Sequence, residues 1–176
     1  MKATGIVRRV DELGRLVIPK EIRRTMRLAE GTPLEIFTDR EGQIILKKYS
    51  PMMELGSFAK QYAESVAQTM NQKVAVSDRD QIIAVAGGGK RELLGKTISR
   101  QLEEMIINRE NSIQAGLDKK TIPLISGDED SYSAQAIYPI CCEGDCIGAV
   151  ILYSRENQTH FSETEYKAAA CAASFL

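Results

Sequence analysis

The feature that most constrains this chain is the arginine-rich stretch Arg8–Arg27, which reads RRVDELGRLVIPKEIRRTMR. Two short strand-like segments, Arg8–Asp11 and Leu16–Ile18, flank a reversal in which Gly14 can adopt a positive φ. Pro19 then ends the second segment and opens a short helix, because its fixed φ suits a first helical turn. The stretch therefore predicts a strand, a tight turn, a second strand and a short helix, packed as one small unit.

The short helix should hide one face and expose its arginines. Ile22 and Met26 lie four residues apart and share an apolar face, so the basic side chains point elsewhere. Arginine carries a fixed charge and a planar fork of donors that fits phosphate groups and guanine edges. The alternative is that each arginine is a solvated surface residue or pairs within the chain, for instance Arg23 with Glu21 or Glu30. The clustering predicts DNA binding by a set of six: Arg8, Arg9, Arg15, Arg23, Arg24 and Arg27.

The distribution of charge supports a polyanionic partner for this end of the chain. The net charge of −1 conceals an asymmetry, since residues 1–50 hold 11 basic against 7 acidic side chains. The remaining residues hold 12 basic against 17 acidic side chains. A basic region joined to an acidic one is typical of proteins that bind a polyanion with one end. Charge alone is equally compatible with ordinary surface solvation.

The first 50 residues should be stable only as a dimer. Leu34–Thr38 alternates apolar and polar residues as a half-buried strand does, and Gln43–Lys48 follows it after a turn at Arg40-Glu41-Gly42. A unit this small with so few large apolar side chains buries too little surface to fold alone. Two copies can share one core, and a two-fold dimer prefers a pseudo-palindromic DNA site.

Three segments of this region carry a specific resemblance: Thr4–Arg24, Pro33–Phe37 and Ile45–Tyr49. They resemble the DNA-binding head of the AbrB family of bacterial transition-state regulators. The resemblance implies a swapped-hairpin β dimer, in which hairpins from both chains interleave. It also implies DNA contacts from Arg8, Arg15, Arg23 and Arg24, with Lys2 and Arg9 as phosphate contacts.

A connecting helix is predicted over residues 51–70, with Ser50-Pro51 as its opening. Apolar residues recur along it at helical spacing, at Leu55, Phe58, Ala59, Tyr62, Val66 and Met70. The stripe is expected to pack on the second domain, although a role as a lever or a share in an intersubunit helical bundle stays open. No flexible linker separates the two ends of the chain.

Residues 71–176 are predicted to form a second domain, an antiparallel sheet with helices against it. Strands are expected at 73–77, 81–86, 121–125, 134–141 and 146–153. Ile98, Leu102, Met105 and Ile106 mark an amphipathic helix, and Ser162 with Glu165 forms a capping box for the last one. The whole chain is thus expected to be a mixed α+β protein of two domains.

The second domain carries a looser resemblance, which covers Ile137–Ile140 and Gly144–Leu152. This hairpin is similar to the closing hairpin of GAF domains, which implies oligomerisation and leaves open whether a small molecule is sensed. The two domains together resemble regulators of gene expression in spore-forming bacteria. The resemblance implies a sequence-preferring transcriptional regulator of sporulation genes, an activator or a repressor, that assembles as a homotetramer through residues 71–176.

Several chemical functions are disfavoured by the residues. Gly87-Gly88-Gly89-Lys90 is not a nucleotide-binding loop, since the pattern requires Gly at Ala84 and Ser or Thr at Arg91. Cys141, Cys142, Cys146 and Cys171 are expected to be free thiols in a reducing cytosol, because their spacing is not that of a zinc knuckle. The single histidine, His160, has no nucleophile or metal-ligand pattern around it. No enzyme activity, metal or cofactor is therefore expected.

The sequence also predicts where the protein acts and leaves one alternative function open. No apolar run approaches the roughly 20 residues needed to cross a membrane, and the N-terminus has no signal-peptide core, so a cytoplasmic, nucleoid-associated protein is predicted. The alternative function is that of an antitoxin, since related DNA-binding heads occur in toxin–antitoxin pairs. Antitoxins usually carry a disordered acidic tail, whereas residues 51–176 are predicted to fold.

Overall fold

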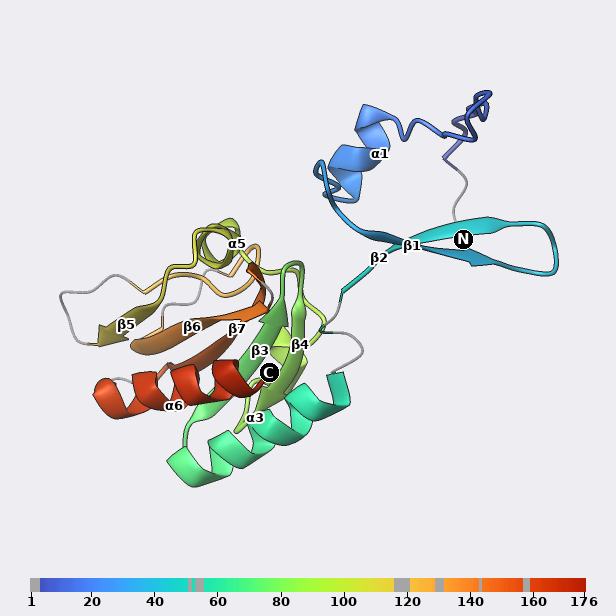
Figure 1. Cartoon of the computed structure of the whole chain (residues 1–176). Coiled ribbons are helices and arrows are strands. Elements are labelled where there is room, and N and C mark those ends of the chain that lie inside the picture. The colour runs from blue at the N-terminus through green and yellow to red at the C-terminus, as the bar shows by residue number, and fades with distance from the viewer. Residues whose placement is uncertain are drawn as a thin grey trace. The chain divides into compact units, whose positions relative to one another are not determined.

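The computed structural model describes residues 4–50, 52, 56–115, 121–128, 132–142, 144–156 and 159–176. It divides into two compact units, Met1–Tyr49 and Ser50–Leu176, which we call the head and the body (Figure 1). The predicted connecting helix belongs to the body, because it packs on strands of the body's sheet. Pro51 and Leu55 lie outside the described residues.

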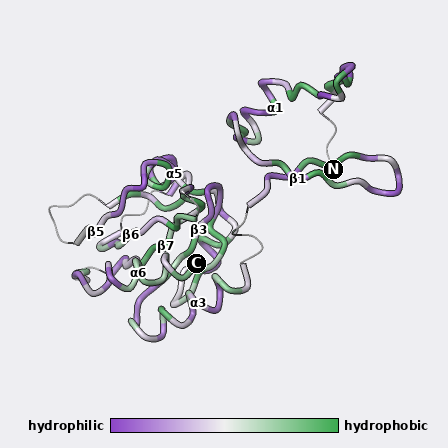
Figure 2. The backbone as a smooth tube through the Cα atoms, in the orientation of Figure 1, coloured by the Kyte–Doolittle hydropathy of each residue, from purple (hydrophilic) through white to green (hydrophobic). Residues whose placement is uncertain are grey.

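The head contains one short helix and one hairpin. The helix α1 (Lys20–Thr25) follows Pro19, and the strands β1 (Leu34–Thr38) and β2 (Ile44–Lys48) pair antiparallel from Leu34↔Lys48 to Thr38↔Ile44. The Asp39 carboxylate accepts hydrogen bonds from the backbone N–H groups of Glu41 and Gln43, which closes the turn. Figure 2 shows this turn as the hydrophilic end of a largely hydrophobic hairpin.

The two strands predicted before α1 are not part of any ladder within the described chain. Residues 4–10 and 16–18 run without sheet pairing, and the reversal between them is held by a bond from Asp11 N–H to the Arg15 carbonyl at 3.0 Å. Val7 and Val17 are left 83% and 73% exposed. The prediction of strands is therefore wrong for the isolated chain, because a strand needs a hydrogen-bonded neighbour and the described residues supply none.

The body is built on one five-stranded antiparallel sheet, in the order β4-β3-β7-β6-β5 (Figure 1). The long hairpin of β6 and β7 provides its centre, and β3 pairs with β7 along six positions. The strands are β3 (Lys73–Asp78), β4 (Ile82–Ala86), β5 (Ser112–Ala115), β6 (Ala134–Cys142) and β7 (Asp145–Ser154).

Helices cover both faces of this sheet. The helices α3 (Gly56–Met70) and α6 (Glu163–Phe175) lie on one face, and α4 (Lys90–Leu93) and α5 (Arg100–Ile107) contribute to the core on the other (Figure 1). Alanines form the buried stripes of α3 and α6, so these helices approach the sheet closely. The predicted apolar stripe is only partly correct, since Phe58 is exposed while Ala59, Ala63 and Ala67 are buried.

Two strand predictions in the body need correction. Residues 121–125 form no strand, and their one sheet-type pairing within the described chain is the isolated bridge of Ile125 with Ile98. The edge strand β5 was not predicted, because its four residues are too short to carry a pattern of alternation. The capping box of α6 is confirmed: Ser162 accepts from the Thr164 N–H, and Glu165 accepts from the Ser162 N–H and hydroxyl.

The glycine loop before α4 serves the packing of the sheet edge. A Cβ at Gly87 would lie 2.5 Å from the Gln72 carbonyl oxygen, and one at Gly89 would lie 2.6 Å from the Tyr153 hydroxyl. The Tyr153 hydroxyl donates to the Gly88 carbonyl at 3.0 Å. These glycines are therefore required by close contacts within the fold.

The cysteines differ from expectation, because Cys141 and Cys146 form a disulfide. The two residues are direct partners across the β6–β7 hairpin, which brings their side chains together; this was not apparent from a spacing of five residues. Cys142 and Cys171 are free and exposed. Within the described part of the chain no cluster of three metal-ligand side chains occurs, and no described helix has the length and hydropathy of a membrane span.

Candidate nucleic-acid interface

The turn before α1 orients Arg15. The Asp11 carboxylate accepts hydrogen bonds from the backbone N–H groups of Leu13 and Arg15, and from the Arg15 Nε at 2.7 Å. The backbone N–H of Arg15, followed by its guanidinium, lowers the pKa of Asp11 below the ordinary value. Asp11 therefore stays ionised and holds both the turn and the arginine at its end, while Arg15 remains 70% exposed.

The helix α1 presents two adjacent arginines to solvent. Arg23 and Arg24 lie in its last turn, where the partial negative charge of the helix end favours a cation. Both side chains are exposed, and neither forms an ion pair with Glu21 or Glu30 among the described residues of the head. The intrachain pairing considered for Arg23 is thus not formed.

The remaining candidates lie at the start of the head. Arg8 donates from Nη1 to the carbonyl of its neighbour Val7 at 3.1 Å, and Arg9 is exposed. Lys2 lies outside the described residues. Of the six residues to which the resemblance assigns DNA contacts, the described head therefore brings five to solvent: Arg8, Arg9, Arg15, Arg23 and Arg24. Among these five only Arg15 has a carboxylate partner.

An apolar hollow of about 430 Å³ lies within the same unit. It is formed by the extended segments on both sides of the turn, by α1 and by the hairpin; its lining includes Ile6, Val7, Leu16, Val17, Ile22, Met26, Leu34 and Leu46. Arg8 lies on its lining as well. A small unit with many of its apolar side chains around an open hollow has an incomplete core, and complementary apolar surface is needed to fill it.

The interior of the body, by contrast, is filled with side chains. Between the sheet and α5 the described residues Leu102, Ile106 and Tyr153 are each at most 1% exposed. Burial raises the pKa of Tyr153 to about 12, so its hydroxyl stays protonated and donates to the Gly88 carbonyl. Surface hollows of about 340 and 310 Å³ lie elsewhere in the body. These buried side chains form the core between the sheet and α5.

Comparison with known families identifies the family to which the chain belongs. Residues 54–176 match the family described as stage V sporulation protein T C-terminal, transcription factor. The chain belongs to the stage V sporulation protein T family. Residues 7–53 separately match the family described as antidote-toxin recognition MazE, bacterial antitoxin. Membership of the stage V sporulation protein T family makes the protein a transcription factor and not an enzyme.

Two relatives and one solved structure are similar to the chain. The stage V sporulation protein T of Bacillus subtilis (strain 168) is 49% identical over 176 residues, which is 100% of this chain and 97% of that protein. The transition state regulatory protein AbrB of the same organism is 66% identical over 53 residues, 30% of this chain and 54% of that protein. The GAF domain of an Acinetobacter phosphoenolpyruvate-protein phosphotransferase matches with a TM-score of 0.56 at 13% identity, over 73% of this chain and 80% of that domain.

These comparisons confirm the resemblances stated from the sequence. As a member of the stage V sporulation protein T family, the chain has an AbrB-like N-terminal region and a body with a GAF-like fold. Asp11 is the residue of the candidate interface that the sequence reading missed. An aspartate four residues before an arginine, with Gly14 between them, is the pattern of a side-chain-closed turn and was the available signal.

Proposed function

We propose that this protein is a sequence-preferring DNA-binding regulator of sporulation genes that binds as a dimer of heads. Two copies fill the apolar hollow of each head by exchanging the extended segments around the turn, which also supplies the ladder partners those segments lack. Arg8, Arg15, Arg23 and Arg24 contact the DNA, and Lys2 and Arg9 contact phosphates. Its site of action is the cytoplasmic nucleoid.

The observation that carries this proposal is the coincidence, in one small unit, of an open apolar hollow and exposed arginines. The hollow of about 430 Å³ explains why the unit needs a second copy. The exposed guanidinium groups explain what the completed dimer binds, because a cluster of fixed positive charges, of which only Arg15 has a described carboxylate partner, attracts a polyanion. The similarity over 53 residues to a transition state regulatory protein supports the same conclusion.

A salt titration of DNA binding tests the proposal. Four arginines per chain give eight per dimer, and if six of them engage phosphates the affinity should fall by about 10³ between roughly 50 and 200 mM salt. Binding of the full chain to a duplex from a sporulation promoter is measured by fluorescence anisotropy, with sedimentation in parallel. A nearly flat salt dependence, or a full chain that sediments as a stable monomer, would refute it.

We further propose that bodies associate to join two dimers into a tetramer through α3 and α6. Tyr62 stacks on Phe175 with centroids 4.7 Å apart, and Phe58 lies 6.4 Å from the same ring. Phe58 and Phe175 are 54% and 59% exposed, although they form part of an aromatic cluster. Exposed aromatic clusters are typical of protein–protein contacts, and a second copy of the same surface satisfies two-fold symmetry.

Light scattering of full-length variants tests this assembly. Phe175→Lys should reduce a tetramer to a dimer and leave the dimer of heads intact. Ile107→Lys is the matched control, because Ile107 is 60% exposed on α5, which packs on the opposite face of the sheet. A tetramer that survives Phe175→Lys, or one that Ile107→Lys disrupts equally, would contradict the assignment.

The match of residues 7–53 to an antitoxin family favours one competing function. In that case the head would bind DNA and the rest of the chain would neutralise a toxin. The body argues against it, because Ser50–Leu176 has a folded sheet and not an extended acidic tail. Affinity purification from the native host distinguishes the two, since an antitoxin would be recovered in stoichiometric complex with a small toxic protein.

A further inference from the structure

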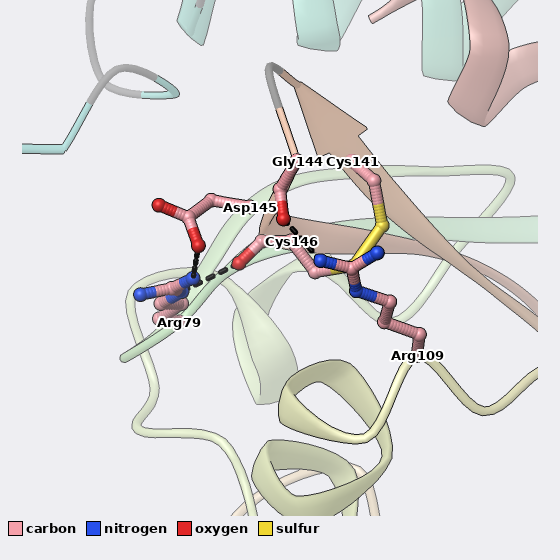
Figure 3. Close-up of a disulfide and its surroundings, with 6 residues drawn as sticks. All are labelled: Arg79, Arg109, Cys141, Gly144, Asp145 and Cys146. Carbon is pink, nitrogen blue, oxygen red and sulfur yellow. Dashed lines mark hydrogen bonds and ion pairs between the residues drawn. A yellow bond between two sulfur atoms is a disulfide. The ribbon is translucent and has the colours of Figure 1, made fainter.

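The tip of the β6–β7 hairpin combines a disulfide with two arginines from other elements (Figure 3). Arg79, in the turn after β3, donates from Nε to the Cys146 carbonyl at 2.5 Å and lies 4.0 Å from the Asp145 carboxylate. Arg109, in the turn after α5, donates from Nη2 to the Gly144 carbonyl. The tip is thus held from two sides by arginines, of which Arg79 also faces the Asp145 carboxylate.

The two cysteines of the disulfide differ in their exposure to solvent. Cys141 is exposed, whereas Cys146 is 3% exposed and belongs to the core between the sheet and α5. Thiol–disulfide exchange requires a thiolate to reach one sulfur while the other departs. The difference in exposure therefore selects Cys141 for attack and Cys146 as the departing sulfur.

A surface hollow of about 310 Å³ opens next to Cys141. Polar residues from three elements line it: Arg109 and Asn111 after α5, Tyr138 on β6 and Ser174 on α6. Its size suits a molecule of a few heavy atoms, and Arg109 gives it a fixed positive charge. The nearest acidic group of the tip that the structure describes, Asp145, already faces Arg79. The hollow thus favours an anionic ligand directly beside an accessible disulfide sulfur.

We propose that Cys141 is a site of thiol–disulfide exchange with an anionic low-molecular-weight thiol. The thiolate of the small molecule attacks the Cys141 sulfur and forms a new S–S bond. The Cys141–Cys146 bond breaks, and its electron pair leaves on the Cys146 sulfur, which takes up a proton from water. One disulfide is consumed and one is formed, so the step requires no further oxidant or reductant.

The surroundings support both the forward step and its reversal. A carboxylate on the thiol pairs with Arg109 in the hollow, and the same guanidinium favours the approach of a thiolate to Cys141. Arg79 keeps the backbone of Cys146 in place through its carbonyl, so the released thiol stays positioned to close the disulfide again. In a thiol-rich compartment, the disulfides that do form are usually transient, and the exposed ones are the labile ones that exchange with thiols.

The test measures opening of the disulfide in the full-length chain with Cys142→Ser and Cys171→Ser, so that the thiols released come only from the pair. The reagents are 3-mercaptopropionate, which is anionic, and 2-mercaptoethanol, which is neutral, with rates expressed per thiolate. Acid quenching and peptide mass spectrometry locate the mixed disulfide. Three further variants are compared: Arg109→Gln, Arg109→Lys, and Arg100→Gln, an exposed arginine of α5 paired with Glu104, as the control.

The expected result is a mixed disulfide on Cys141 and a preference for the anionic thiol. Arg109→Gln should lower the ratio of the two rates about threefold, the effect of one partly exposed ion pair. Arg109→Lys and Arg100→Gln should retain the ratio. Circular dichroism establishes that Arg109→Gln and Arg109→Lys are both folded, so a changed ratio reports the lost charge. A mixed disulfide on Cys146, a ratio unaffected by Arg109→Gln, or an oxidised protein without the Cys141–Cys146 bond would overturn the proposal.

Discussion

Replacement of Arg23 by alanine tests the proposed interface most directly. Arg23 is exposed in the last turn of α1 and forms no ion pair with the described acidic residues of the head. Alanine has at least the helix propensity of arginine, so the change should leave α1 intact. What the variant loses is one guanidinium per head, and hence two per dimer.

The magnitude follows from counterion release. Each phosphate contact contributes about 0.9 to the slope of log affinity against log salt concentration, so loss of two contacts lowers the slope by about 1.8. Extrapolated to about 0.15 M salt, this corresponds to an affinity roughly 30-fold weaker than that of the unmodified dimer. The loss should shrink as salt rises, because the missing term is itself screened.

The assay is fluorescence anisotropy with a labelled promoter duplex over a series of salt concentrations. Arg40→Ala is the matched control, because Arg40 is an exposed arginine of the same unit in the β1–β2 turn and the charge change is identical. Circular dichroism and sedimentation establish that both variants retain the folded dimer. Equal slopes for the two variants would mean that total charge, and not the α1 surface, governs binding; a monomeric or unfolded Arg23→Ala would mean that the residue is structural.

Three further predictions concern the body, and urea unfolding measures each. Gly148→Ala should destabilise the body by about 1–3 kcal/mol or more, because a Cβ there would lie 2.1 Å from a carbonyl oxygen of β3. By contrast, a Cβ at Gly56 in α3 would meet nothing within 4 Å, so Gly56→Ala should stabilise the body by up to about 1 kcal/mol. Ser162→Ala should cost about 1 kcal/mol. Burial raises the pKa of Glu165, but hydrogen bonds from Ser162 outweigh it and lower that pKa below 4.5, so this cap contribution should be lost as pH falls through the lowered value. Burial raises the pKa of Asp78 above 3.8, so the contribution of Asp78 to stability should decrease as pH rises from 3.8 through the raised pKa. Asp78→Asn should therefore be at least as stable as the parent at pH 7. A less stable Asp78→Asn would show that the hydrogen bonds to the carboxylate outweigh its desolvation.

In the body, local sequence patterns predicted several elements but not the contacts between them. The hairpin predicted from residues 134–141 and 146–153 located β6 and β7, and the spacing of Ser162 and Glu165 located the start of α6. The disulfide was missed, because only the register of the β6–β7 hairpin places Cys141 opposite Cys146. The exposure of Phe58 was missed as well, since α3 packs through its alanines and the hydrophobic pattern alone favoured the larger side chain.

In the head, too, some features of the candidate interface follow from local sequence and others from tertiary contacts. Its arginine cluster, the turn at Gly14 and the helix after Pro19 are local features, and the sequence by itself determined them because backbone φ preferences and side-chain charge act over a few residues. Only the tertiary structure decided that Asp11 orients Arg15, that an apolar hollow opens between the extended segments and the hairpin, and that the interior of the body is filled. Those properties depend on distances between segments far apart in the chain, which no local pattern fixes.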